Sequence, residues 1–213
     1  MSTTRDEVLE ATEGLTGVTI PVRVVLESQQ VVLTQPEMRA LLDAAEVIAI
    51  GDCLCRQEEG NCRNPLDVCI ALDAAATERI ADRSWRVISV EEALGVLEKT
   101  HDLGLVHLAY RRWDGDVNLV CSCCTCCCQP LNALKRFTYR DGITASAFVA
   151  RFDPSKCVGC GVCAGRCAFG AFTIPEGAEC ASFEEGSCFG CGLCVATCPG
   201  GALELVARRV EAA

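Results

Sequence analysis

The chain carries one cysteine pattern twice near its C-terminus, as CVGCGVCAGRC at residues 157–167 and as CFGCGLCVATC at residues 188–198. In each copy, three closely spaced cysteines are followed by a fourth. Three thiolates at this spacing wrap one face of an iron–sulphur cube, and the fourth points to a neighbouring cube. The pattern therefore predicts two [4Fe–4S] clusters. The predicted ligands are Cys157, Cys160, Cys163 and Cys198 for the first cluster, and Cys188, Cys191, Cys194 and Cys167 for the second.

The residues around the two copies repeat as well. Phe152 precedes the first copy and Phe183 the second, and a short apolar run follows each at residues 171–174 and 202–205. The region resembles the bacterial-type two-[4Fe–4S] ferredoxin. The resemblance implies a pseudo-twofold module in which each half runs strand, cluster loop, short helix, strand. Ala168 departs from the family, which often has proline after the fourth cysteine, but the ligand itself is kept. A zinc ribbon would need paired cysteines rather than triplets.

Ten further cysteines lie upstream in two groups. The first group is Cys53, Cys55, Cys62 and Cys69, and the second is Cys121, Cys123, Cys124, Cys126, Cys127 and Cys128. A lone cysteine such as Cys180 is commonly a small buried hydrophobic residue. So many clustered thiols would instead oxidise or bind metal. The ten are therefore predicted to be metal ligands that hold one or more additional iron–sulphur clusters.

The number and type of these upstream centres stay open. Four thiolates in the first group suffice for one [4Fe–4S] cluster. Neighbours such as Cys123 and Cys124 tend to point in different directions, so the second group serves one cluster, two clusters, or a larger centre shared with the first. Arg56 and Arg63 either donate to cluster sulphurs or are solvated surface residues.

Two histidines and one carboxylate complete the candidates for chemistry. His107 is expected to be a hydrogen-bonded core residue rather than a ligand, and His101 a surface residue. Asp52 and His107 are the candidates for proton transfer. We find neither a Gly-x-Gly-x-x-Gly motif leading into a helix nor a Walker loop, so redox partners are expected to supply and remove electrons.

The whole pattern is similar to a group of 4Fe–4S ferredoxin-domain proteins of anaerobic and facultative microbes. The resemblance is carried by Cys53, Cys55, Arg56, Cys62, Pro65, Leu66, Asp67, Cys69, residues 104–107 and residues 121–128, followed by the ferredoxin-like region. It implies iron–sulphur binding and adds nothing on a substrate.

Composition restricts the partners and the compartment. The chain has 213 residues, 19 cysteines and a formal net charge of −10. This acidity disfavours nucleic acid and favours redox partner proteins with a basic docking surface. No apolar run reaches the length of a membrane span, and residues 1–6 lack the layout of a signal peptide. Abundant thiols then predict a cytoplasmic protein.

The N-terminal region reads as helix–strand units. Thr34 with Glu37, and Ser89 with Glu92, form two capping boxes, each followed by residues at helical spacing and then a short apolar run. The predicted class is α+β. A mixed α/β, cysteine-rich domain at residues 1–147 is followed by a ferredoxin-like two-cluster domain of pseudo-twofold βαβ type at residues 148–213.

Three functions are compatible with this organisation. The favoured one is a low-potential electron-transfer protein or redox subunit that relays electrons through the two clusters and the N-terminal centres. The second is a reductase whose atypical N-terminal centre binds the substrate. The third is an iron–sulphur sensor or delivery protein, a role that an exposed Cys126–Cys128 segment would suit.

Overall fold

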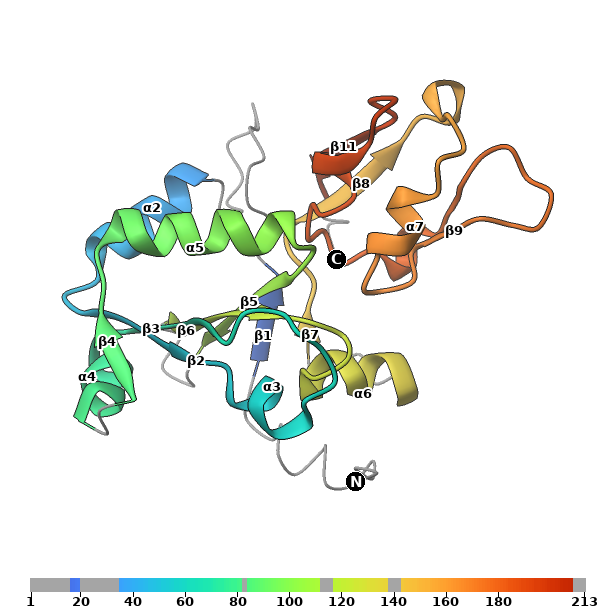
Figure 1. Ribbon diagram of the computed structural model, residues 1–213. Coiled ribbons are helices and arrows are strands. Elements are labelled where there is room, and N and C mark those ends of the chain that lie inside the picture. Colours follow the sequence, from blue (N-terminus) through green and yellow to red (C-terminus); the bar gives the residue numbers. More distant parts are fainter. Residues whose placement is uncertain (1–15, 20–34, 82–83, 112–116, 138–142, 209–213) are drawn as a thin grey trace, which may run out of the picture.

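The computed structural model describes residues 16–19, 35–81, 84–111, 117–137 and 143–208 (Figure 1). A seven-stranded sheet with helices on both faces forms the N-terminal part, and two small two-stranded sheets form the C-terminal part. The described strand pairs are antiparallel except one, which is compatible with the α+β class. In the ranges above, no helix has the length and apolarity that crossing a membrane requires.

The large sheet has the strand order β4-β2-β3-β6-β5-β1-β7, with β1 and β7 as its parallel pair. Its strands are β1 (Thr16–Thr19), β2 (Ile48–Asp52), β3 (Asp67–Leu72), β4 (Trp85–Val87), β5 (Val106–Arg111), β6 (Val117–Cys123) and β7 (Ile143–Thr144). Strands β3 and β6 are far apart in sequence but neighbours at the centre of the sheet. Their pairing brings the first cysteine group against the second.

One face of the sheet is covered by α2 (Gln35–Ala44) and α5 (Val90–Asp102) (Figure 1). Ser89 Oγ accepts the backbone N–H of Glu92 at 3.1 Å, which confirms the predicted start of α5. Leu42 of α2 and Leu97 of α5 are buried in one apolar cluster with Ile70 of β3. The corresponding Thr34 cap lies outside the described residues.

The opposite face carries α4 (Asp73–Ala81), α6 (Gln129–Phe137) and the short α3 (Leu54–Glu59). Ala75 and Ala76 let α4 approach Ala71 of β3 closely, because alanine has the smallest side chain with a Cβ. Leu131 of α6 packs on Leu108 of β5. Both faces of the central strands are therefore closed to water.

The C-terminal part repeats one unit twice. Its elements are β8 (Phe148–Phe152), η1 (Pro154–Lys156), α7 (Val162–Arg166), β9 (Phe172–Thr173), β10 (Ser182–Phe183), η2 (Glu185–Ser187), η3 (Val195–Thr197) and β11 (Leu203–Ala207). Strand β8 pairs with β11, and β9 with β10. Gly159 and Gly190 hold equivalent places in the two copies and have φ values of +65° and +70°, which glycine adopts without strain.

The two parts share a core. Phe169 and Phe189 stack with centroids 4.4 Å apart and belong to one buried cluster with Val106 of β5 and Leu131 of α6. Arg166 of α7 donates to the carbonyl oxygens of residues 101 and 102, at the C-terminal end of α5. A cation is favourable there because the exposed carbonyls carry partial negative charge. The division at residue 147 stays a prediction.

Candidate metal centres

One cavity of the C-terminal part is lined by four cysteines from both repeats. They are Cys157, Cys160, Cys163 and Cys198. Cys157 and Cys160 come from the loop after η1, Cys163 from the start of α7, and Cys198 from the end of η3 in the other repeat. Cys160 is exposed, so this cavity lies near the surface.

A second cavity is lined by the complementary four. They are Cys167, Cys188, Cys191 and Cys194. Cys167 and Cys191 pack against the core shared with Val106 and Leu131. This cavity therefore faces the N-terminal part of the molecule. Burial raises the pKa of Cys191 to about 12, so without a metal this thiol keeps its proton.

Backbone N–H groups donate to equivalent sulphurs in the two repeats. Ala171 N–H lies 3.2 Å from Cys167 Sγ, and Ala202 N–H lies 3.3 Å from Cys198 Sγ. Such donors offset the negative charge of a thiolate and orient it towards a metal. The donor set thus suits iron–sulphur clusters.

Residues 156–203 match the family model described as the 4Fe-4S dicluster domain. This segment is a ferredoxin-type 4Fe–4S module. All eight cysteines of the two copies lie within the matched ferredoxin module. A search of the curated proteins finds no match to the chain.

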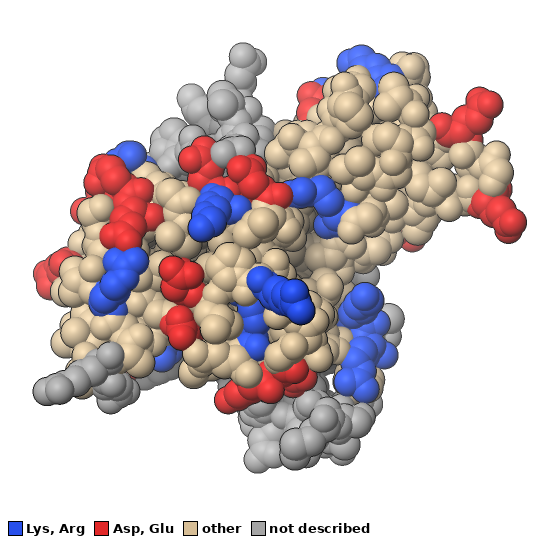
Figure 2. Space-filling view, viewed as in Figure 1, with Lys and Arg blue, Asp and Glu red and all other residues tan. Residues whose placement is uncertain are grey.

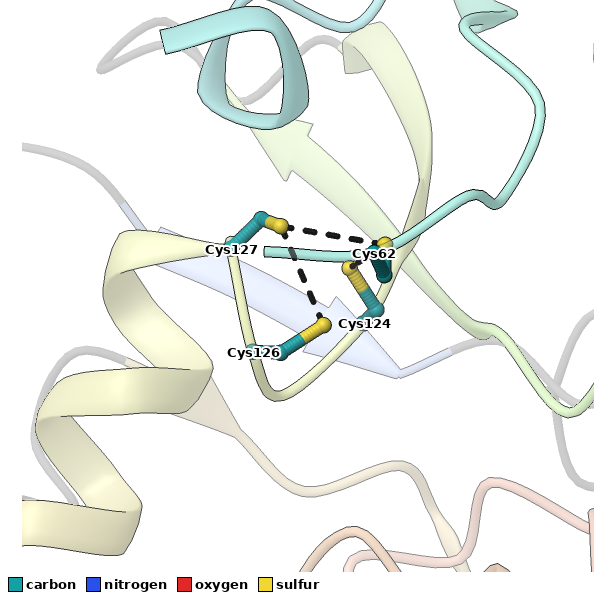
Figure 3. A group of neighbouring side chains, drawn as sticks. All are labelled: Cys62, Cys124, Cys126 and Cys127. Carbon is teal, nitrogen blue, oxygen red and sulfur yellow. Dashed lines mark hydrogen bonds between the residues drawn. The ribbon is translucent and has the colours of Figure 1, made fainter. Parts of the chain in front are cut away.

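Four of the upstream thiols converge in what we call the four-thiol site. Its members are Cys62, Cys124, Cys126 and Cys127 (Figure 3). Their sulphur atoms all lie within 4.8 Å of one another. Cys62 comes from the segment between α3 and β3, and the other three from the turn between β6 and α6. Asn61 Nδ2 holds the two segments together by donating to the carbonyl oxygen of Cys126 at 2.9 Å.

The other six upstream thiols form a second group, the six-thiol ring. Its members, in order of contact, are Cys55, Cys53, Cys69, Cys121, Cys123 and Cys128. Each thiol interacts with the next, and the charges of Cys128 and Cys55 close the circle.

The pairing of β3 with β6 brings cysteines of the ring together. Ile70 of β3 is opposite Val120 of β6, so continuing this antiparallel pairing places Cys69 opposite Cys121. Cys123 follows Cys121 by two residues and therefore points to the same face of the sheet. Cys124 and Cys127 belong to the four-thiol site, whereas their sequence neighbours Cys123 and Cys128 belong to the ring. Adjacent cysteines thus serve different groups.

The ring cannot hold six thiolates without a metal. Hydrogen bonds from Cys55 and Cys69 lower the pKa of Cys53, and hydrogen bonds from Cys123 and Cys69 lower the pKa of Cys121 to about 5. The same contacts, with burial, raise the pKa of Cys69 and Cys123 well above the usual value. A bound metal ion would supply the positive charge that full ionisation needs.

Arg56 lies between the two thiol groups with 2% of its surface exposed. Its guanidinium donates to the carbonyl oxygens of Pro65 and Ser122, and its Nη2 lies 3.7 Å from Cys124 Sγ. Burial lowers the pKa of Arg56, but the hydrogen bond and charge of Cys124, with the charge of Cys53, outweigh it and raise the pKa. Of the two sequence alternatives, Arg56 is therefore a donor to sulphur, whereas Arg63 is exposed.

The histidines lie on the opposite face of the sheet from the ring. His107 is buried, and Ser122 Oγ lies 3.2 Å from its Nδ1. Burial lowers the pKa of His107 to about 3, so it is neutral and suits the expected core role. The expectation for His101 is wrong: it is 1% exposed and stacks on His107, because it follows Leu97 by four residues and so lies on the buried face of α5. Asp52 accepts a hydrogen bond from Gln57.

Three further findings depart from expectation. The Cys126–Cys128 segment is not exposed throughout. Cys127 packs with Leu105, and Cys128 packs with Leu131 of α6, so 1% and 4% of their surfaces are accessible. Cys180 is not an isolated hydrophobic residue, because its thiol interacts with Cys157. Tyr110 was missed as a site residue. Burial and the negative charges of the ring thiols raise the pKa of its half-buried phenol. No motif in the sequence marks this residue.

Proposed function

We propose that the protein is a low-potential electron carrier. It relays electrons between redox partners through two [4Fe–4S] clusters of the ferredoxin module and a further iron–sulphur centre on the six-thiol ring. The proposal is supported most directly by the two cavities, each lined by three cysteines of one repeat and one of the other. The first cluster would be held by Cys157, Cys160, Cys163 and Cys198, and the second by Cys188, Cys191, Cys194 and Cys167.

The positions of the cavities suggest a path. Cys160 is exposed beside the first cavity, which gives a partner access to the first cluster. Cys191 of the second cavity shares an apolar core with Cys123 and Cys128 of the ring. Electrons would thus pass from the surface, through the second cluster, to the ring. The apolar core between them keeps water away, which limits the reorganisation that accompanies each transfer.

The partner would present a basic surface near the first cluster. Glu176 and Glu179 are exposed in the loop between β9 and β10, whose backbone approaches Gly159 in the first cysteine loop. In the same module, Arg151 is paired with Glu204 and Lys156 with Asp153. Figure 2 shows acidic side chains at the tip of the module and over α2 and α5. Association should weaken with salt.

A reducing compartment fits this chemistry. Thiolate ligands persist where disulphides do not form, and all 19 cysteines are free. We therefore propose a cytoplasmic location.

The test compares anaerobically purified variants. Cys163→Ser and Cys194→Ser should each lose about four irons and the matching sulphide, because each removes a ligand of a different cube. Thr173→Ser, an exposed change on β9, is the control and should lose none. Electron paramagnetic resonance of the reduced protein should lose one signal in each ligand variant. Loss of all the module's iron in one variant and none in the other would contradict the assignment of one cysteine triplet to each cluster.

A reductase is the second candidate, favoured by a cavity of about 710 Å³ between the two parts. Cys124 and Cys126 line one wall, and Arg166 and Cys167 line another. A small oxidant bound there would lie beside the second cluster. Gly165→Trp, placed on the cavity wall, should block substrate turnover but leave electron transfer to a protein partner intact. An unchanged turnover would exclude this cavity.

A further inference from the structure

The sulphur atoms of the four-thiol site are spaced for a single ion. Cys62 Sγ lies 3.8 Å from both Cys124 Sγ and Cys127 Sγ, and Cys127 Sγ lies 3.8 Å from Cys126 Sγ (Figure 3). Four sulphurs arranged tetrahedrally around one Zn²⁺ at about 2.3 Å are about 3.8 Å apart. Around a cube the thiolates stand farther apart, because each caps a different iron at a corner.

The ferredoxin module provides an internal comparison. All its eight cysteines are described, yet no three of their sulphurs approach within the 4.8 Å that contains the four-thiol site. The module's thiols therefore surround wider cavities, whereas these four meet at a point. The same chain thus contains two kinds of thiol quartet.

We propose that the four-thiol site binds one tetrahedral zinc ion and no iron–sulphur cluster. A site with four thiolates and no bridging sulphide selects its metal by affinity, and Zn²⁺ binds such ligands more tightly than Fe²⁺. Four thiolates leave no open position, which is the mark of a structural site.

The surroundings of the site match this role. Four thiolates and Zn²⁺ carry a net negative charge, and Arg56 Nη2 and Asn64 Nδ2 lie 3.7 Å and 3.4 Å from Cys124 Sγ and Cys62 Sγ. Such outer groups hold thiolates in place and offset their charge. The ion would join the α3–β3 segment to the β6–α6 turn. That turn carries Cys123 and Cys128 at its ends, so the zinc would fix part of the six-thiol ring.

The test counts metals in the full-length holoprotein, purified anaerobically from cells supplied with both iron and zinc. We expect about one zinc per wild-type chain. Cys126→Ser should remove this zinc and leave the iron and sulphide of the ferredoxin module unchanged, and the control Arg63→Gln, at an exposed residue next to Cys62, should change neither metal. Wild-type protein without zinc, or Cys126→Ser that loses iron and sulphide but no zinc, would overturn the proposal.

A measurement on the wild-type protein keeps the test valid if the variant does not fold. X-ray absorption at the zinc edge should show a single shell of four sulphurs at about 2.3 Å. Nitrogen or oxygen ligands in that shell would overturn the proposal. Neither result depends on the electron-carrier function, because the iron count and the reduction of the ferredoxin module are measured separately on the same sample.

Discussion

Replacing Gly190 by alanine should loosen the second cysteine loop. Gly190 has φ +70°, and a Cβ there would overlap the carbonyl oxygen of Phe148 and the hydroxyl oxygen of Ser146. Both belong to the segment that enters β8. The overlapping neighbours are held in place, since Ser146 Oγ donates to Gly190 O at 3.0 Å and Ser146 N–H donates to Phe189 O at 3.0 Å. The loop must therefore move away from β8.

Two costs add in this variant. Left-handed backbone costs a residue with a Cβ about 1–2 kcal/mol. Forcing an extra carbon into a packed site costs about 1–3 kcal/mol more. The sum is about 3 kcal/mol, and in a chain of this length each kcal/mol shifts the melting temperature by about 2–4 °C. We expect a decrease of about 10 °C and faster iron loss from the second cluster.

Two other glycines of the module separate these costs. Gly170 has φ +72°, and a Cβ added there would meet no atom within 4 Å, so Gly170→Ala should show the backbone cost alone, about 3–6 °C. Gly165 lies in α7 with equally open surroundings, so Gly165→Ala should leave the melting temperature unchanged or raise it slightly.

The assay follows circular dichroism and cluster absorbance together under anaerobic conditions at one heating rate. The expected order of melting temperatures is Gly165→Ala highest, then Gly170→Ala, then Gly190→Ala. If Gly190→Ala has the same melting temperature as Gly170→Ala, the second cysteine loop does not pack against the start of β8. The described geometry of the second cavity is then wrong.

Three further predictions concern the N-terminal part and its junction with the module. Arg56→Gln should release zinc from the four-thiol site about 10–100 times more readily, measured by a chromogenic chelator, whereas exposed Arg63→Gln should not. His107 resists protonation when folded, so falling pH favours the unfolded chain. Between pH 7.5 and 5.5 the free energy of unfolding should decrease by about 1.4 kcal/mol. His107→Gln should not show this decrease, so its denaturant midpoints at the two pH values should differ less than those of the wild-type protein. Phe169→Ala should lower that free energy by about 3–5 kcal/mol and speed iron loss to a chelator; equal rates would show that the shared core does not support the second cluster.

Local spacing explains what the sequence could predict. The four cysteines of each copy lie within eleven residues of chain, so their spacing alone suggests the cluster loops, and the family match covers them. The cap at Ser89 is equally local, because its partner Glu92 is three residues away. Such features depend on neighbours in the chain and need no knowledge of the tertiary fold.

Long-range register explains what the sequence could not predict. Cys69 and Cys121 meet only because β3 and β6 pair, and nothing near either cysteine signals that pairing. The sequence groups therefore differ from the groups in space: Cys62 leaves the first group and joins three members of the second. The contacts of Arg56 could not be predicted either, because its acceptor Ser122 is far away in the chain.

Alternation along β6 connects these observations. Cys121 and Cys123 point to the ring, whereas Ser122 between them points to the other face and contacts Thr100 and His107. A slip of one residue would put Ser122 into the ring and two thiols among the α5 side chains. The buried hydroxyl and imidazole lose their hydrogen bonds in that register, which costs about 1–3 kcal/mol for each unsatisfied group. The polar contacts on one face of the sheet therefore hold the ring thiols in position on the other, and the metal binding proposed for the ring would need both.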